Sequence, residues 1–278
     1  MECFGHFFYL DGMVHPAGVS EEPAAGDVAF YEVIRTRNGV PLFFNDHMNR
    51  LRDGISTRYE LKGDIGDDVR SGLNELISRE RYEEINVRVT VTFTGRDHSL
   101  HICYIPSYYP SPAMVREGVP LILFHAERLN PGVKMLNNRL RLSVNEELSR
   151  RGAYEALLVN SEGFITEGSR SNIFFVTEEG VVQTAPDSMV LSGITRRYVT
   201  DIIREEGIPI VFQAVRDDSL SGFTAAFITG TSPMVLPVRS IDGREFDVAN
   251  ELTLKLRVIY SRLAERSIMD YLNGNEAE

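Results

Sequence analysis

The chain has 278 residues, of which 43% are hydrophobic, and a formal net charge of -11 at pH 7. This length suffices for one large domain or two modest domains with hydrophobic cores. The acidic balance argues against nucleic acid as a partner. No apolar run approaches the length of a membrane span, so we expect a soluble protein without a membrane partner.

The first residues and the cysteines predict the compartment. Residues 1–5 lack a basic region and a cleavage site, so we expect no signal peptide. The two cysteines, Cys3 and Cys103, are too few for a disulfide framework. The simplest interpretation is two reduced, mostly buried thiols in a cytoplasmic protein. We expect no metal site.

The first hundred residues alternate mostly in the manner of strands. Strands are predicted at residues 7–10, 28–37, 40–44, 87–94 and 100–105. Asn38-Gly39 between two apolar strands is a strong hairpin signal. Asn45 or Asp46 can cap a following helix, and apolar residues at helical spacing predict a second helix at 67–79.

Residues 106–112 form a proline-rich, nonperiodic break. We therefore predict a small N-terminal α/β domain at 1–105, an interdomain linker at 106–117 and a large C-terminal domain at 118–278. In the large domain, strands are predicted at 121–125, 156–159, 173–176, 208–213 and 225–229, and helices at 139–151, 195–206 and about 251–272. The charged end, 273–278, reads as a frayed tail.

One lysine is set among apolar residues. Lys134 lies in the segment Val133-Lys134-Met135. A lysine taken alone is usually a solvated surface residue. In apolar surroundings it loses its proton more readily, because desolvation disfavours the ammonium. A neutral amine is the form that attacks an aldehyde.

The residues after Lys134 carry a specific pattern. Lys134 and Asn137 are followed by Glu147, Gly152, Tyr154 and Glu155-Ala156, then by Thr166-Glu167-Gly168-Ser169-Arg170-Ser171-Asn172-Ile173-Phe174. This pattern resembles the fold type IV pyridoxal-phosphate enzymes, which include D-amino acid aminotransferase, branched-chain aminotransferase and aminodeoxychorismate lyase. The resemblance implies a two-domain α/β (α+β) homodimer, with a β-barrel-like sheet in the larger domain.

The resemblance also implies roles at the cofactor, pyridoxal 5'-phosphate. This group needs a lysine for its aldehyde, a carboxylate for its ring nitrogen and donors for its phosphate. Lys134 matches the family's Schiff-base lysine, which also acts as the general base. Glu167 matches the acid at the pyridine nitrogen, although from the sequence alone it reads as a turn residue. Ser171 and Asn172 would frame the cofactor.

Three segments match the family's phosphate contacts. His47-x-x-Arg50-Leu51 contains the expected arginine, whose planar fork suits phosphate oxygens; taken alone, it reads as a surface helix charge. Leu191-Ser192-Gly193-Ile194-Thr195-Arg196 would open a helix whose free N–H groups bind an anion, with Leu191 packed on the ring. Gly230 and Thr231 match the last phosphate contact, although short Gly/Thr loops are usually turns.

The substrate class is suggested by Phe30-Tyr31-Glu32-Val33. This segment, with Tyr31 as a substrate-binding residue, resembles the D-amino acid aminotransferases rather than the Phe-Glu-Gly of branched-chain enzymes. In the D-type enzymes an Arg-x-His loop of the partner subunit holds the substrate carboxylate. Arg96 and His98 have that spacing, but their loop is shorter and lacks the usual proline. Other arginines that could hold the carboxylate are Arg88, Arg35 and Arg37.

These residues together predict a cytoplasmic, homodimeric, pyridoxal-phosphate-dependent aminotransferase. The expected reaction is transamination between a D-amino acid, such as D-alanine or D-glutamate, and a 2-oxo acid, such as 2-oxoglutarate. Three alternatives stay open: a branched-chain L-amino acid aminotransferase, an aminodeoxychorismate lyase, and a noncatalytic protein that binds the cofactor.

Overall fold

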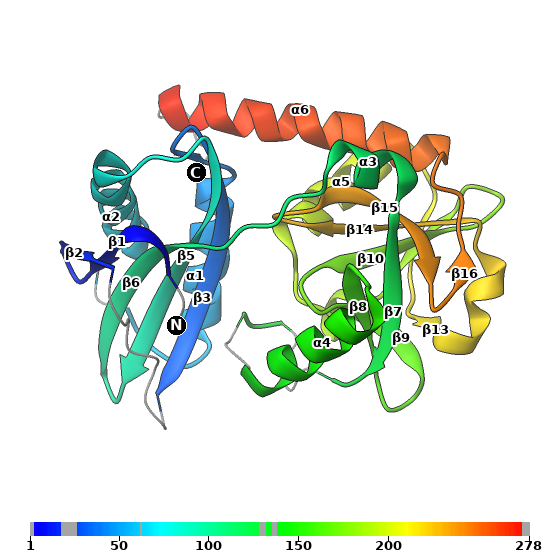
Figure 1. The fold of residues 1–278 in the computed structure, drawn as a ribbon, viewed down its shortest axis with the longest axis horizontal. Coiled ribbons are helices and arrows are strands. Elements are labelled where there is room, and N and C mark those ends of the chain that lie inside the picture. The colour runs from blue at the N-terminus through cyan, green and yellow to red at the C-terminus, as the bar shows by residue number, and fades with distance from the viewer. Residues whose placement is uncertain (1–2, 18–26, 62, 128–131, 135–137, 274–278) are drawn as a thin grey trace. The chain divides into compact units, whose positions relative to one another are not determined.

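The computed structural model describes residues 3–17, 27–61, 63–127, 132–134 and 138–273 (Figure 1). The chain divides into two compact units. The N-terminal unit comprises Met1–Tyr108, Val133–Leu136 and Ala264–Glu278, and the C-terminal unit comprises Tyr109–Gly132 and Asn137–Leu263. Compared with the predicted division, the N-terminal unit also takes in the segment that carries Lys134 and the end of the chain.

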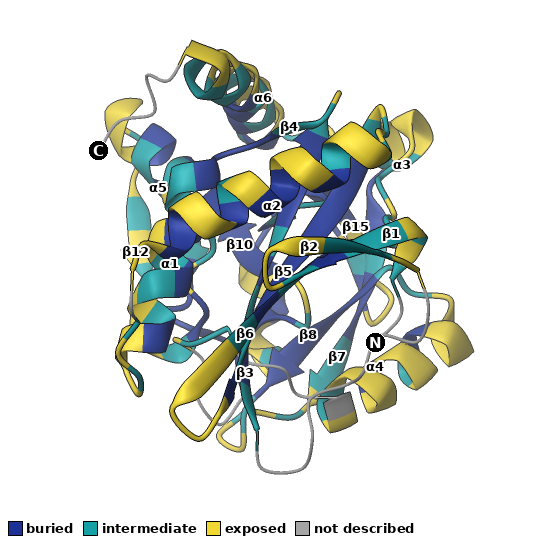
Figure 2. Ribbon diagram, turned by 90° about the vertical axis from the view of Figure 1, so that its left-hand side faces the viewer, coloured by how far each residue is buried: buried dark blue, intermediate teal, exposed yellow. Residues whose placement is uncertain are grey.

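The N-terminal unit is built on a six-stranded antiparallel sheet with the order β2-β1-β6-β5-β3-β4. Its strands are β1 (Phe4–Leu10), β2 (Met13–Pro16), β3 (Val28–Arg37), β4 (Val40–Pro41), β5 (Glu84–Thr94) and β6 (Asp97–Ile105). Helices α1 (Phe44–Ser56) and α2 (Ile65–Arg79) contribute apolar side chains to one core with this sheet. Figure 2 shows the exposed and buried sides of α2, as expected of an amphipathic helix.

The predicted hairpin is confirmed, because Asn38 and Gly39 both adopt positive φ, 49° and 78°, between β3 and β4. The predicted helix cap is wrong. The first helix has Phe43 as its N-cap, in left-handed conformation with φ 51° and with no side-chain cap bond. Asn45 and Asp46 lie inside the first turn instead. The strand predicted to reach Phe44 therefore ends at Pro41.

The two faces of this sheet have different chemistry. Alternate residues of β5, including Val87, Val89 and Val91, belong to the core that α1 and α2 share. The residues of β5 between these positions point to the other face of the sheet. Residues paired with them on β3 and β6 point to the same face, so the pairs line up in two rows across the three strands. One row joins Val33, Arg88 and Cys103, and the other joins Tyr31, Thr90 and His101. We call this polar side the outer face.

The C-terminal unit contains a second sheet of ten strands with the order β12-β11-β10-β14-β15-β7-β8-β9-β13, and β16 pairs with β15. The strands are β7 (Val119–His125), β8 (Glu155–Val159), β9 (Phe164–Gly168), β10 (Asn172–Val176), β11 (Val182–Thr184), β12 (Ile210–Phe212), β13 (Val215–Arg216), β14 (Ala225–Gly230), β15 (Met234–Ile241) and β16 (Arg244–Glu245). Strands β7 and β8, β7 and β15, and β11 and β12 pair in parallel, and the other pairs are antiparallel.

Three helices of this part of the chain match the predictions closely, and a fourth, α3 (Pro112–Glu117), lies within the segment predicted as a linker. The other three are α4 (Asn138–Arg151), α5 (Ile194–Glu205) and α6 (Glu251–Asn273), with short 3-10 turns at Asp187–Met189 and Asp217–Gly222. The predicted mixed α/β class is confirmed, while the predicted tail beyond residue 273 lies outside the described residues. Within the described ranges, no helix is both long and apolar enough to cross a membrane.

Candidate active site

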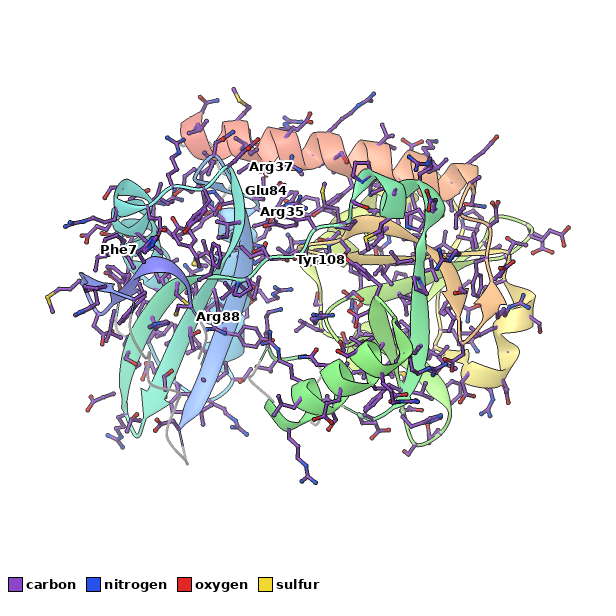
Figure 3. The ribbon with its side chains drawn as sticks, in the orientation of Figure 1. Phe7, Arg35, Arg37, Glu84, Arg88 and Tyr108 are labelled. Atoms are coloured by element: carbon purple, nitrogen blue, oxygen red, sulfur yellow. The ribbon has the colours of Figure 1, made fainter. Side chains whose placement is uncertain are left out.

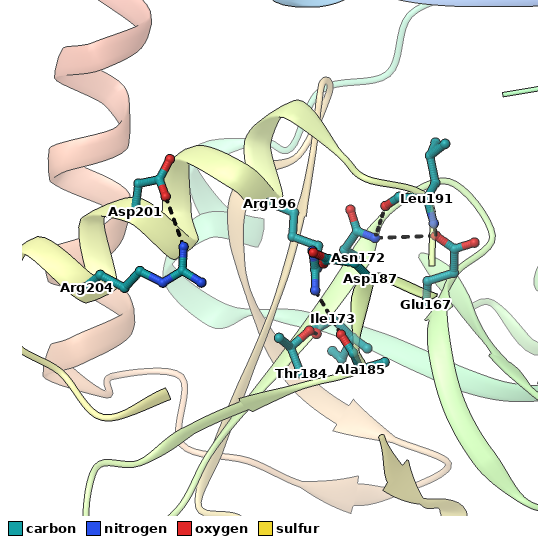
Figure 4. A network of polar contacts seen from close by, with 10 residues as sticks. All are labelled: Glu167, Asn172, Ile173, Thr184, Ala185, Asp187, Leu191, Arg196, Asp201 and Arg204. Carbon is teal, nitrogen blue, oxygen red and sulfur yellow. Dashed lines mark hydrogen bonds and ion pairs between the residues drawn. The ribbon is translucent and has the colours of Figure 1, made fainter. Parts of the chain in front are cut away.

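Glu167 lies near the end of β9 and is 2% exposed. Its Oε2 accepts a hydrogen bond from the backbone N–H of Leu191 at 3.0 Å and another from Asn172 Nδ2 at 3.4 Å (Figure 4). Asn172 Nδ2 also donates to the carbonyl oxygen of Leu191 at 3.0 Å. Three residues predicted for the cofactor site thus form one buried network.

A second buried acid, Glu155, holds the turn between β9 and β10. Its Oε1 accepts from Ser169 Oγ at 2.6 Å and from the backbone N–H of Ala156 at 2.8 Å. Its Oε2 accepts from the backbone N–H of Arg170 and from Ser171 Oγ, both at 3.1 Å. A carboxylate with four donors stabilises this turn strongly, because hydrogen bonds to charged groups are stronger than neutral ones. Sequence analysis placed Glu155 in the motif without giving it this role.

Helix α5 begins beside this network. Its N-cap is Gly193, which offers no side-chain cap bond. A Cβ at Gly193 would lie 2.2 Å from Asn172 Oδ1, so the backbone approaches Asn172 too closely for any other residue. The first N–H groups of the helix, at Ile194 and Thr195, are therefore in reach of an anion that approaches the helix end.

Two side chains fix the first turn of α5. Arg196 is 4% exposed, donates from Nη2 to the carbonyl oxygen of Ala185 at 2.8 Å and pairs through Nη1 with Asp187 (Figure 4). Thr195 Oγ1 lies 3.0 Å from the hydroxyl oxygen of Tyr260. These contacts connect the first turn of α5 to the segment 185–187 and to α6.

The loop predicted to contact phosphate lies next to the same turn. Asn172 and Thr229 are paired across β10 and β14, and Gly230 ends β14. A Cβ at Gly230 would be 3.3 Å from the carbonyl oxygen of Arg170. Thr229 Oγ1 is buried and makes no hydrogen bond with any described residue. Gly230, followed by Thr231, is thus brought together with the turn that holds Ser171.

Lys134 belongs to the N-terminal unit and is half-buried. Its carbonyl oxygen accepts a hydrogen bond from the backbone N–H of Tyr31 at 3.2 Å, which fixes the segment against β3. Its Nζ lies 5.1 Å from the centroid of the Tyr31 ring. The predicted lysine and the predicted substrate-binding tyrosine are therefore neighbours. Asn137, which the motif also includes, lies outside the described residues.

Arg50 is bound by an acid for which sequence analysis gave no role. Glu32, fully buried on β3, accepts from Arg50 Nε at 2.7 Å and from Arg50 Nη2 at 2.6 Å. His47 Nδ1 lies 2.8 Å from Glu32 Oε2. The period-2 alternation of β3 places Glu32 on the helix side of the sheet, and this could have signalled a buried ion pair.

The surroundings shift the pKa values of this group. Burial alone would raise the pKa of Glu32, but the charge of Arg50 and the hydrogen bonds from His47 and Arg50 outweigh it and hold that pKa well below its usual range. Burial lowers the pKa of His47, and the charges of Arg50 and Lys134 act in the same direction, against the hydrogen bond to Glu32. At neutral pH the group is an ionised acid, a charged arginine and a neutral imidazole.

The candidate arginines for the substrate carboxylate differ in their partners. Arg35 and Arg37 both pair with Glu84, at 2.9 and 2.7 Å (Figure 3). Arg88 is 6% exposed, and its contact among described residues is Cys103 Sγ, 3.7 Å from Nη2. Its Nε is buried and makes no hydrogen bond in the part of the chain that the structure describes.

Arg96 lies in the turn between β5 and β6, His98 lies at the start of β6, and both are exposed. The His98 ring contacts Phe93, with 5.5 Å between the ring centroids. Arg88 lies in the middle of β5 and on the outer face of the sheet, while Arg96 lies beyond the end of that strand, after Gly95. The structure thus does not bring Arg96 and His98 together with Tyr31 and Lys134 within one chain.

These donor sets fit pyridoxal phosphate. The C-terminal unit offers a buried carboxylate oriented by Leu191 and Asn172, and beside it a helix N-terminus without a side-chain cap. Such a terminus favours a phosphate through its N–H groups and its dipole. The N-terminal unit offers a lysine amine and an arginine whose orientation is fixed by an acid. Each chemical demand of the cofactor is met by at least one residue.

Comparison with known proteins also points to a pyridoxal-phosphate enzyme. A family description, Amino-transferase class IV, matches residues 29–241. The D-alanine aminotransferase of Bacillus licheniformis is 32% identical over 232 residues, which cover 77% of this chain and 79% of that enzyme. A Methanocaldococcus jannaschii protein, provisionally assigned as a branched-chain-amino-acid aminotransferase, is 32% identical over 253 residues, 84% of this chain and 85% of that protein.

Solved structures agree on the fold. The branched-chain aminotransferase of Thermoproteus uzoniensis with norvaline aligns with a TM-score of 0.81 and 23% identity, covering 96% of this chain and 97% of that one. The T.th. branched-chain aminotransferase with pyridoxamine 5'-phosphate aligns with a TM-score of 0.80 and 23% identity, covering 95% and 96%. The chain belongs to the class IV aminotransferases, enzymes of fold type IV that use pyridoxal 5'-phosphate.

Proposed function

We propose that the chain transfers an amino group between a D-amino acid and a 2-oxo acid, with D-alanine or D-glutamate as donor and 2-oxoglutarate as acceptor. The observation that carries the proposal is the position of Tyr31, whose ring centroid lies 5.1 Å from Lys134 Nζ. Tyr31 belongs to the Tyr-Glu-Val segment that resembles the D-type enzymes. The likeness to the Bacillus licheniformis D-alanine aminotransferase supports the same substrate class.

We assign the cofactor contacts as follows. When bound, pyridoxal phosphate supplies an aldehyde carbon and an electron-accepting ring. Lys134 Nζ is assigned to the aldehyde and the Glu167 carboxylate to the ring nitrogen, where an ionised acid keeps that nitrogen protonated. Leu191 would pack on the ring, and Ser171 and Asn172 would frame the cofactor. The phosphate is assigned to Arg50, the α5 N-terminus at Gly193, Ile194 and Thr195, and the loop at Gly230 and Thr231.

Lys134 is also assigned the proton transfer. With the cofactor bound, its amine would act as a general base that takes the proton from Cα of the donor amino acid, and then as a general acid that returns a proton. We propose a homodimer, as the resemblance to fold type IV enzymes implies, and a cytoplasmic location, which the two cysteines suggest.

Arg88 is our candidate for the group that binds the substrate carboxylate. It shares the outer face with Tyr31, and its neighbour Thr90 also carries a buried hydroxyl without a hydrogen bond among described residues. Buried polar groups normally make hydrogen bonds. Arg88 Nε and Thr90 Oγ1 make none among the described residues, and they lie on the same face of β5, so we expect a polar ligand there. A carboxylate fits, because a guanidinium binds it through charge-assisted hydrogen bonds.

The test compares Arg88→Leu with Arg96→Ala. If Arg88 binds the carboxylate, its loss raises KM for 2-oxoglutarate about 10- to 100-fold, as expected for a hydrogen-bonded charge, while Arg96→Ala has little effect. Arg88→Lys should recover part of the affinity for the acid. The reverse pattern would assign the carboxylate to the turn that carries Arg96 and His98.

A second candidate is a branched-chain L-amino acid aminotransferase. The Methanocaldococcus jannaschii relative and the solved structures above favour it. A paired screen of D- and L-amino acid donors, with 2-oxoglutarate as acceptor, separates the two. Turnover with D-alanine or D-glutamate above that with L-leucine supports our proposal, and turnover with L-leucine alone rejects it. Pyruvate released from aminodeoxychorismate would point to the lyase instead.

A further inference from the structure

Two cysteines and one histidine lie close together on the outer face of the N-terminal sheet. The side-chain ligand atoms of Cys3, His101 and Cys103 all lie within 4.8 Å of one another. Cys3 Sγ is 3.9 Å from His101 Nε2. Cys103 is buried, while Cys3 and His101 are partly exposed, so an ion could enter from solvent. None of the three residues has a role in the aminotransferase reaction proposed above.

An irregularity of the first strand brings Cys3 to this position. Phe4 pairs with Tyr104 and Phe8 with Cys103, so β1 has three more residues than β6 between these pairs. Gly5 has φ 90°, and its backbone lies so close to Glu80 that a Cβ would be 2.7 Å from Glu80 Oε2. The backbone N–H of His6 donates to the same oxygen at 2.8 Å. Glu80 therefore stabilises the bulge, and bulges are common next to functional sites.

The spacing suits a tetrahedral ion. With Zn–S bonds of about 2.3 Å and Zn–N bonds of about 2.0 to 2.1 Å, ligand atoms of one tetrahedral site lie roughly 3.5 to 3.8 Å apart. Small side-chain rotations from the present separations would reach this range. Two cysteines and one histidine form a ligand set that zinc accepts, with a fourth position left for water or a substrate atom.

We propose that Cys3, His101 and Cys103 bind one thiophilic divalent metal ion of the zinc class. On binding, the two thiols lose their protons to solvent and the two thiolates neutralise the ion. Arg88 Nη2, 3.7 Å from Cys103 Sγ, becomes a hydrogen-bond donor to a metal-bound sulfur. Donors around the ligands orient them and strengthen a metal site. The proposal stands without the assigned substrate, because it depends only on these side chains.

The alternative is a pair of packed, reduced thiols. A hydrogen bond to Cys3 and burial both raise the pKa of the Cys103 thiol, which favours its uncharged form in this place. The two interpretations differ in one measurable property, which is stoichiometric binding of a soft metal ion that requires all three side chains.

Metal titration of the purified, cofactor-loaded enzyme tests the proposal. Cobalt(II) is added in the presence of a non-thiol reductant, and the thiolate-to-cobalt charge-transfer absorption is recorded, followed by displacement with zinc. We expect one ion per chain and at least a tenfold loss of affinity in Cys3→Ser, His101→Gln and Cys103→Ser. Cys3→Ser and His101→Gln change partly exposed side chains, so they test the site even if Cys103→Ser folds poorly.

Controls separate this site from other ligands. His125→Gln alters an exposed histidine of the C-terminal unit and should leave cobalt binding unchanged. Arg88→Leu should weaken binding while keeping one ion per chain, because it removes only the donor to sulfur. Absence of a charge-transfer band, or a band that persists in both Cys3→Ser and His101→Gln, would overturn the proposal.

Discussion

Glu32 accepts two hydrogen bonds from Arg50, at 2.7 Å from Nε and 2.6 Å from Nη2. The pair holds the guanidinium plane in one orientation, because both donors of the fork are engaged. Glu32 is fully buried, so breaking the pair would leave an uncompensated charge. The proposed phosphate contact of Arg50 therefore depends on an acid that itself needs no contact with the cofactor.

The first prediction concerns Glu32→Gln. The variant should lose about 3 to 5 kcal/mol of unfolding free energy, the cost of removing one partner of a buried ion pair. Its affinity for pyridoxal phosphate should fall as well, since Arg50 is no longer held. Urea unfolding and cofactor titration measure the two effects. Glu147→Gln, which breaks an exposed pair with Arg150, is the control; equal losses in both variants would contradict the prediction.

The second prediction concerns pH and His47. Burial lowers the pKa of His47 in the folded state, so below about pH 6.5 the unfolded chain binds a proton that the folded chain does not. Stability should therefore fall as the pH drops from 7.5 to 5.5, by at most about 1.4 kcal/mol per pH unit for this one proton. The change in unfolding free energy per pH unit should be smaller in His47→Gln than in the parent, and it should be unchanged in His125→Gln, a control at an exposed site. Equal slopes in all three proteins would refute it.

The third prediction concerns Gly193→Ala. The added Cβ would lie 2.2 Å from Asn172 Oδ1, so either Asn172 or the start of α5 must move. We expect cofactor affinity to drop at least tenfold, with a smaller change in stability. Gly222→Ala is the matched control, because its Cβ would meet no atom within 4 Å. Cofactor affinity measured by fluorescence titration checks this, and an unchanged value in Gly193→Ala would count against the role of the helix end.

The fourth prediction concerns Glu155→Gln. An amide can accept only at its oxygen, so the variant cannot satisfy the four donors that Glu155 now accepts. We expect a loss of about 1 to 3 kcal/mol in stability and weaker cofactor binding, because the turn with Ser171 loosens. Thermal unfolding with and without cofactor measures both. If the variant is as stable as the parent, the turn between β9 and β10 does not depend on the Glu155 carboxylate, and the prediction is wrong.

Local signals in the sequence predicted local structure well. Asn38-Gly39 predicted the hairpin because both residues tolerate positive φ. The start of α1 was missed because Phe43, a bulky residue with no cap bond, takes the left-handed position that Gly or Asn usually occupies. Nothing in the local pattern indicates that choice.

Long-range relationships were harder to predict. Motif positions identified Glu167, Asn172 and Leu191, and the structure joins them through hydrogen bonds. The roles of Glu32 and Glu155 depend on partners 15 to 18 residues and 14 to 16 residues away, respectively. Helix and strand periodicities relate only nearby residues of one element, so they do not predict these contacts between elements. The proposed metal-ligand cluster joins residues nearly one hundred positions apart, through a bulge that the sequence does not reveal.

The most direct test of the account is to find which lysine carries the cofactor. The purified enzyme is reduced with borohydride, digested and analysed by mass spectrometry for a phosphopyridoxyl group. We predict that the group lies on Lys134, and that Lys134→Ala loses both the group and turnover. A label on Lys62 or Lys255, or full turnover in Lys134→Ala, would contradict the account.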